Sequence, residues 1–243
     1  MPLAFFKVDW SGYLPDLWHA LLRTLEFTAA GFAGAAVLGL LLALMRLSPV
    51  WPLRALAAMY TELFKNVPLI AIVLLIYNGL AQIGIVFGIF QAGVLSLVVF
   101  YAAYLSEIFR AALTGVHSGQ KEAAEALGMS RLATFAHVTF PQALRLALPG
   151  TNTMLVDLLK STSLLVVIGA FELMTQAQLI ASSTFRAFEV YSVIAGIYFV
   201  LCFSLSQALL WFERQVRGGV ALSPGRRRRL SAARTLLEEG ATA

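Results

Sequence analysis

Asp157 and Lys160 place a carboxylate and an ammonium group three residues apart in an apolar part of the sequence. At that spacing both side chains lie on one face of a helix. The next three residues carry hydroxyl groups: Ser161, Thr162 and Ser163. This set complements a small zwitterion such as an amino acid, since Lys160 suits its carboxylate and Asp157 its ammonium group. We predict that these residues line a pathway for such a solute, where a locally broken helix also exposes backbone groups.

A structural explanation of the same residues stays open. Asp157 and Lys160 are also placed to neutralise each other, or to bond across to a neighbouring helix. Glu62 and Lys65 repeat the three-residue spacing beside Pro68. This second pair fits either the lining of a pathway or a structural ion pair.

Several other chemistries have no basis in the sequence. His19, His117 and His137 are far apart, so we expect no metal site and no clustered catalytic set of a membrane enzyme. No Gly-x-x-x-x-Gly-Lys-Ser/Thr motif occurs, so we expect this chain not to bind ATP by itself. Cys202 stands in an apolar run and is expected to act as a small buried hydrophobe.

The composition indicates a membrane protein. Hydrophobic residues make up 59% and charged residues 13% of the 243 positions, whereas soluble domains carry about 25% charged residues. Spans of about 20 residues divide the chain into an all-α integral membrane fold. The five predicted spans are residues 19–46, 53–78, 92–116, 141–171 and 190–212, within a membrane domain at 19–214. The predicted remainder comprises an outer or interfacial segment at 1–18, a loop at 117–140, an uncharged loop at 79–91, a polar loop at 172–189 and a disordered basic tail at 215–243.

The distribution of cations predicts the orientation in the membrane. Five spans put the two ends of the chain on opposite faces. Thirteen of the 18 lysines and arginines then fall on the face that carries loop 117–140 and the tail, while loop 79–91 has none. Because cytoplasmic loops are enriched in cations, we expect this face to be cytoplasmic and the N-terminus to be outside.

The loop at 117–140 contains a short segment that is typical of a helix with a sharp end. Glu122 and Glu125 are expected in its first turn, where carboxylates suit the helix dipole. Ala123 and Ala124 are strong helix formers, and Gly128 is placed to stop the helix in a left-handed turn. The segment predicts a protruding knob for another protein to bind, although an ordinary surface helix is the alternative that these residues alone leave open.

Motifs around this segment resemble those of ABC importer permeases, and more narrowly those of the polar amino acid permeases for histidine, glutamine and glutamate. The similar stretches are Arg23-Thr24-Leu25, Asn66-Val67-Pro68-Leu69, Tyr104 to Arg110, Gly119-Gln120, Phe140 to Arg145, Leu148-Pro149 and Leu159 to Leu164. The resemblance extends from about Leu21 to Arg214. Lys65-Asn66 and Ser161 depart from the family pattern, in which an Arg with a small residue and an Asp are usual, and this leaves the substrate open.

The resemblance implies a type I ABC importer permease fold in a bacterial plasma membrane, with a cytoplasmic coupling helix. It implies a second permease subunit, identical or homologous, two ATPase subunits that bind ATP and Mg, and an extracytoplasmic amino-acid-binding protein. The coupling residues would be Glu122, Ala123, Ala124, Glu125 and Gly128, inserted into a cleft of the ATPase. We expect no cofactor in this chain and no nucleic-acid partner; Arg226 to Arg229 would be attracted to anionic lipid. An importer of another small solute, or a carrier or channel without an ATPase, remains the alternative.

Overall fold

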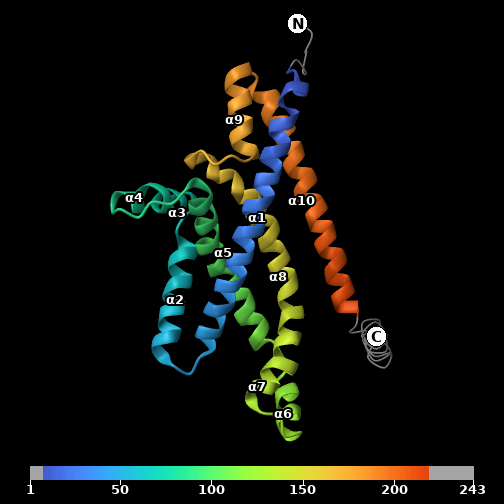
Figure 1. The fold of residues 1–243 in the computed structure, drawn as a ribbon. Helices are drawn as coiled ribbons and strands as arrows, with labels where there is room; N and C mark the ends of the chain where they lie inside the picture. The colour runs from blue at the N-terminus through green and yellow to red at the C-terminus, as the bar shows by residue number, and fades with distance from the viewer. Residues whose placement is uncertain (1–7, 219–243) are drawn as a thin grey trace, which may run out of the picture.

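The computed structural model describes residues 8–218, and every regular element in that part of the chain is helical (Figure 1). The long helices are α1 (Trp10–Leu47), α2 (Trp51–Asn66), α5 (Ile89–Thr114), α8 (Phe140–Ser161) and α10 (Ala187–Gly218). Shorter elements join them: α3 (Leu69–Leu74), the π-helix η1 (Leu75–Gly79), α4 (Leu80–Gln82), α6 (Ser118–Ala126), α7 (Arg131–Thr134), the π-helix η2 (Phe135–Thr139), the 3₁₀-helix η3 (Thr162–Ile168) and α9 (Leu173–Thr184).

The described helices include four that are long and apolar enough to cross a membrane, and five if one bent pair counts as a span. The bent pair is α2 with the helical segment Leu69–Gln82, which meet at 106°. The predicted all-α membrane fold is therefore confirmed, and the predicted span at 53–78 is broken by a sharp bend. Val67 is extended, with φ −102° and ψ 131°, because the ring of Pro68 disfavours a helical residue before it.

Small residues let α1 and α5 pack closely. A Cβ atom added at Gly34 would lie 2.5 Å from the side chain of Val98, and one at Gly39 would lie 2.9 Å from that of Leu105. Close approach of this kind is how membrane helices associate, since lipid offers no hydrophobic driving force between them. Gly34 and Gly39 of the first span thus serve packing.

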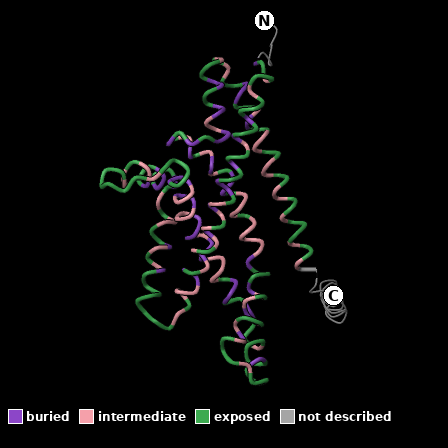
Figure 2. The backbone as a smooth tube through the Cα atoms, in the orientation of Figure 1, coloured by how far each residue is buried: buried purple, intermediate pink, exposed green. Residues whose placement is uncertain are grey.

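The chain has two distinct ends and one lateral projection, which Figure 1 shows. α9 and the first turns of α1 lie at one end of the bundle, while α6 and α7 lie at the other. α3 and α4 project sideways, and we call residues 69–88 the arm. Figure 2 shows that the outer part of the arm and much of α10 are exposed, whereas Leu69, Ile72, Val73 and Ile76 at the start of the arm are buried in the core. The exposed side chains are largely apolar, for example Ile83 and Val86 on the arm and Phe199 on α10.

Residues 172–189, which we expected to form a polar loop, contain the helix α9. Glu172 caps this helix: its carboxylate accepts hydrogen bonds from the backbone N–H groups of Met174 and Thr175, both at 2.7 Å. The hydroxyls of Thr175 and Tyr198 also donate to it. Burial raises the pKa of the Glu172 carboxyl, although these donors favour its charged form. The prediction failed because a capping carboxylate was read as a sign of a solvated loop.

Two other predicted boundaries differ from the structure or lie beyond it. α10 continues to Gly218, so the predicted disordered tail does not begin at residue 215. The basic run at 226–229 and the N-terminal residues 1–7 lie outside the described part of the chain.

Candidate coupling and pathway sites

α6 begins earlier than its acidic residues suggested. His117 is the N-cap, and its Nδ1 accepts a hydrogen bond from the backbone N–H of Gly119 at 3.2 Å. The first turn of α6 therefore holds no acidic residue. The prediction that Glu122 and Glu125 occupy that turn is wrong, because an imidazole, which is an uncommon cap, starts the helix at Ser118.

The end of α6 follows the prediction for Gly128. This residue has φ +77°, and its N–H donates to the carbonyl of Glu125 at 2.9 Å. The N–H of Met129 donates to the carbonyl of Ala124 at 3.1 Å. These two bonds form a Schellman motif, which satisfies carbonyl groups that the helix end would leave unpaired. The chain then reverses direction, and Ser130 caps α7 by accepting from the N–H of Ala133.

We call residues 117–139 the coupling unit. It lies at the end of the bundle opposite α9 (Figure 1). Leu127 is 84% exposed and Leu132 is 78% exposed, although both are large and apolar. A cleft of about 360 Å³ runs between the unit and the ends of α1 and α5, with Lys121 and Glu125 among its lining residues. The unit therefore offers apolar side chains and carboxylates on a short, firmly terminated helix.

Asp157 does not pair with Lys160. Its Oδ2 accepts a hydrogen bond at 2.9 Å from the hydroxyl of Tyr101 on α5, and that hydroxyl lies 2.7 Å from the Oγ of Ser161. Among the residues that the structure describes, no carboxylate forms an ion pair with Lys160. One turn of α8 thus carries a carboxylate held by a buried tyrosine and an ammonium group with no counter-ion.

Lys160 lines two cavities along α8 and α10. One, of about 610 Å³, is also lined by Asp157, Asn152 and Glu213; the other, of about 400 Å³, is also lined by Ser163 and the two tyrosines of α10, Tyr191 and Tyr198. Thr162 is buried instead, and its hydroxyl donates to the carbonyl of Leu159 at 2.7 Å. α8 changes to the 3₁₀-helix η3 at Thr162, so the hydroxyl run does coincide with a change in backbone geometry.

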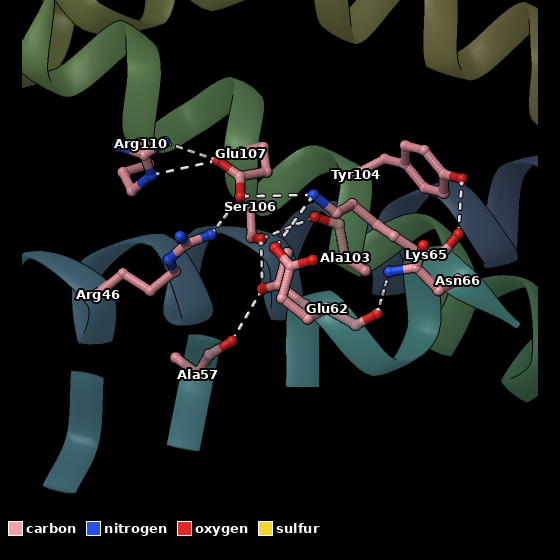
Figure 3. A network of polar contacts seen from close by, with 11 residues as sticks. Arg46, Ala57, Glu62, Lys65, Asn66, Ala103, Tyr104, Ser106, Glu107 and Arg110 are labelled. Carbon is pink, nitrogen blue, oxygen red and sulfur yellow. Dashed lines mark hydrogen bonds and ion pairs between the residues drawn. The ribbon is translucent and has the colours of Figure 1, made fainter. Parts of the chain in front are cut away.

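Glu62 and Lys65 do not join this site but another one, drawn in Figure 3. Lys65 Nζ lies 3.5 Å from an oxygen of Glu62 and 3.7 Å from Oε1 of Glu107 on α5. Arg110 lies 2.8 Å from the other oxygen of Glu107, and Arg46 of α1 contacts Oε1. We call these five residues the Glu107 cluster.

Two partners of these charged residues were not evident from the sequence: Tyr101, which contacts Asp157, and Arg46, which contacts Glu107. Tyr101 stands in an apolar stretch where its ring suggested only packing, and Arg46 looked like an ordinary inside-facing cation. Their contacts, to Asp157 and Glu107 respectively, join residues 56 and 61 positions apart. The only signal available was that a polar group inside a span requires a partner, and that rule does not identify the partner.

Comparisons with known proteins agree on one family. A family model described as "Binding-protein-dependent transport system inner membrane component" matches residues 35–218. The "Probable glutamine ABC transporter permease protein GlnM" of Bacillus subtilis is 34% identical over 86% of this chain and 94% of its own length. The "Glutamine transport system permease protein GlnP" of Escherichia coli is 34% identical over 87% of this chain and 99% of its own length.

Solved structures give the same result for the fold. A chain from the "Crystal structure of an amino acid ABC transporter with histidines" superposes with a TM-score of 0.80 at 38% identity, and the match covers 86% of this chain and all of that one. A chain of the MetNI methionine ABC transporter in an inward-facing conformation superposes with a TM-score of 0.73 at 20% identity, over 86% of this chain and 99% of that one. The second match concerns the fold alone.

Proposed function

The chain belongs to the family of binding-protein-dependent transport system inner membrane components, and we propose that it is the permease subunit of an ATP-driven importer of polar amino acids. It is a multi-pass inner-membrane protein and a transport subunit, not itself an enzyme. Nucleotide binding belongs to a separate ATPase. The observation that carries the proposed substrate class is the 34% identity to glutamine permeases over nearly the whole of those chains.

We assign contact with the ATPase to Glu122, Ala123, Ala124, Glu125 and Gly128 of the coupling unit. The exposure of Glu122, Ala123, Glu125 and Gly128 at one end of the bundle supports their assignment, because a partner must reach these residues without entering the membrane. Ala124 is buried, so its contribution would be to pack α6 against the bundle rather than to offer its side chain to the ATPase. The Schellman motif supports the assignment too, since its hydrogen bonds fix the end of α6. A helix with a fixed end transmits a displacement better than one with a frayed end. ATP-driven closure of an ATPase dimer would then displace the coupling unit and, through α5 and α8, the bundle.

We assign the solute pathway to the α8 and α10 side of the chain. Lys160, which forms no ion pair with any residue in the described part of the chain, and Asp157 offer an ammonium group and a carboxylate to the two ends of a zwitterion. Ser163 and Ser161 add hydroxyls nearby. Thr162 shapes the change from α8 to η3 rather than facing either cavity. Glu62 and Lys65 are part of a separate charge cluster and are assigned no contact with solute.

The complex would contain an ATPase dimer, a second permease subunit, identical or homologous, and an extracytoplasmic binding protein. The coupling unit would face the cytoplasm, as the distribution of cations predicts. The arm supports a second permease subunit at its side, because its exposed side chains are apolar and the backbone between Gln82 and Ile89 is not helical. Irregular backbone at membrane depth is tolerated where protein or water covers it.

Uptake in cells that express or lack the chain tests this proposal. Labelled glutamine, histidine, arginine and a sugar are supplied in turn, and an ATPase subunit is sought in complexes purified through a tag on this chain. We expect chain-dependent, ATP-dependent uptake of at least one amino acid and a co-purifying ATPase. Uptake of the sugar alone would favour an importer of another solute, and uptake without any ATPase would favour a carrier or channel.

A further inference from the structure

α2 contacts the rest of the chain through several polar groups and a small apolar surface. Ala57 and Thr61 are its buried residues. Thr61 Oγ1 lies 3.2 Å from the Oγ of Ser106 on α5, and the hydroxyl of Tyr60 donates to the carbonyl of Val99 at 2.9 Å. The apolar side chains of α2, in contrast, are largely exposed. The position of α2 against α5 therefore depends on hydrogen bonds and ion pairs together with a small apolar contact, in which Ala57 packs with Leu42 and Ala102.

Glu107 is the centre of these ion pairs. Arg46, Lys65 and Arg110 all contact its carboxylate, whose side chain is only 27% exposed. The second carboxylate of the cluster, Glu62, is 64% exposed and lies against Lys65 alone. Charges that are partly removed from water interact strongly. Without the charge of Glu107, three cations from three helices would face one another (Figure 3).

The cluster also stands between the coupling unit and the arm. Arg110 is in the last turns of α5, just before the chain enters the coupling unit. Lys65 is in the last turn of α2, after which the chain bends by 106° into the arm. Arg46 is in the last turn of α1. Glu107 thus joins the helix that leads to the coupling unit to the helix that carries the arm.

We propose that Glu107 is a positioning residue that makes α1, α2 and α5 move as one body when the ATPase closes. A displacement of the coupling unit then reaches α2 through the ion pairs of Glu107, in addition to the apolar contacts that hold the start of the arm against α5, and solute movement stays tied to ATP hydrolysis. This inference rests on the proposed function of the chain as the permease of an ATP-driven importer.

The test is the ratio of solute taken up to ATP hydrolysed, measured in proteoliposomes that hold the complete transporter and its binding protein. Glu107→Gln keeps the size of the side chain and removes its charge. We expect this ratio to fall about 5- to 150-fold, the usual range of coupling between distant sites, while the amount of complex and the ATP hydrolysis are retained. Glu26→Gln is the matched control, since Glu26 forms an exposed pair with Arg23 on α1; its ratio should not change.

Further variants keep the test decisive. Combining Arg46→Gln with Glu107→Gln removes one unneutralised cation and should restore part of the ratio. If Glu107→Gln does not assemble, Arg46→Gln alone removes one of the three contacts and should lower the ratio in an assembled complex. An unchanged ratio in an assembled Glu107→Gln complex would overturn this inference and leave the proposed function intact. If the Glu107→Gln complex does not form, an unchanged ratio in the Arg46→Gln complex would have the same meaning. A wild-type complex without ATP-dependent uptake would overturn the proposed function and this inference with it.

Discussion

Gly128 is the residue at which α6 stops, and its φ of +77° is unfavourable for side chains branched at Cβ. Gly128→Val should distort the end of α6 and lower uptake several-fold, whereas Gly128→Asn, which tolerates this backbone conformation, should retain most of it. No atom lies within 4 Å of a Cβ added there, so crowding within the chain does not contribute. Uptake per assembled complex is the measurement, and equal uptake by the two variants would contradict the argument.

The end of α6 was predicted correctly from the local sequence, whereas its start was not. Gly128 was predicted because few residues other than glycine adopt a left-handed conformation readily. The start was misplaced because the cap is His117, while the acidic residues are also compatible with later turns. A backbone constraint that one residue type satisfies best can be read from sequence; a cap that many residue types can form is harder to place.

Lys160 has no carboxylate partner among the described residues and lines both cavities. Lys160→Ala should lower uptake by about tenfold or more, since a charge-assisted hydrogen bond to a carboxylate contributes about 1.5–3 kcal/mol. Lys160→Arg keeps the charge and should retain part of the uptake. Assembly with the ATPase should be normal in both variants. Wild-type uptake by Lys160→Ala would remove this residue from the pathway.

Glu172 predicts a pH dependence of stability. Burial raises its pKa above the ordinary value of 4.5, so the folded chain retains the proton at pH values where the unfolded chain has lost it. This contribution is present below the ordinary pKa and is lost as the pH rises through the raised pKa. Thermal unfolding in detergent at several pH values should show that decline for the wild type.

In Glu172→Gln the pH-dependent decline should be absent. This variant should also be less stable by about 1–3 kcal/mol, because each carboxylate oxygen accepts from two donors and the two donors that face the amide NH2 group lose their acceptor. The same pH dependence in wild type and variant would assign the titration to another group.

The coupling unit is the element that we propose docks onto the ATPase, so assembly should depend on it. Leu127 is among its most exposed apolar side chains, so a change there costs the fold of this chain little. Leu127→Asp should weaken ATPase binding by about tenfold or more, because burial of an apolar side chain contributes about 1.5–3 kcal/mol. Leu179→Asp is the control: Leu179 is also exposed, but on α9 at the opposite end of the bundle. Binding of purified ATPase subunit to each variant is the measurement, and equal affinities would argue against a docking function for the unit.

Among the elements, the long apolar helices were predictable and the breaks were not. Hydropathy identifies α1, α5, α8 and α10, because crossing a membrane requires a long apolar helix. The bend after Asn66 and the helix α9 depend on tertiary contacts instead. α9 packs Leu173 and Ile180 into a cluster with α1 and α10, and the motif Asn66-Val67-Pro68 allows a break without fixing its angle. The length of the hydrophobic stretches thus predicts how many spans there are, but it does not predict where a span bends.

The whole molecule separates two kinds of site. The α8 and α10 side carries Lys160 and its cavities, and the α1, α2 and α5 side carries the Glu107 cluster. Both sides are joined to the coupling unit, through α8 and α5 respectively. The sequence presented Asp157 with Lys160 and Glu62 with Lys65 as equivalent pairs, since spacing along one helix does not show which other helices lie opposite. Only the fold shows that the two pairs lie in different surroundings, and our proposals of a solute pathway for one and a positioning function for the other rest on that difference.

The central claim is that the coupling unit lies on the cytoplasmic face and is covered by an ATPase. Leu127→Cys in a Cys202→Ser background gives a single exposed thiol at that unit. We expect a membrane-impermeant maleimide to label it in inside-out vesicles stripped of ATPase, to leave it unlabelled in intact cells, and to lose access when the ATPase is added back. Labelling of this thiol from outside intact cells would contradict the account.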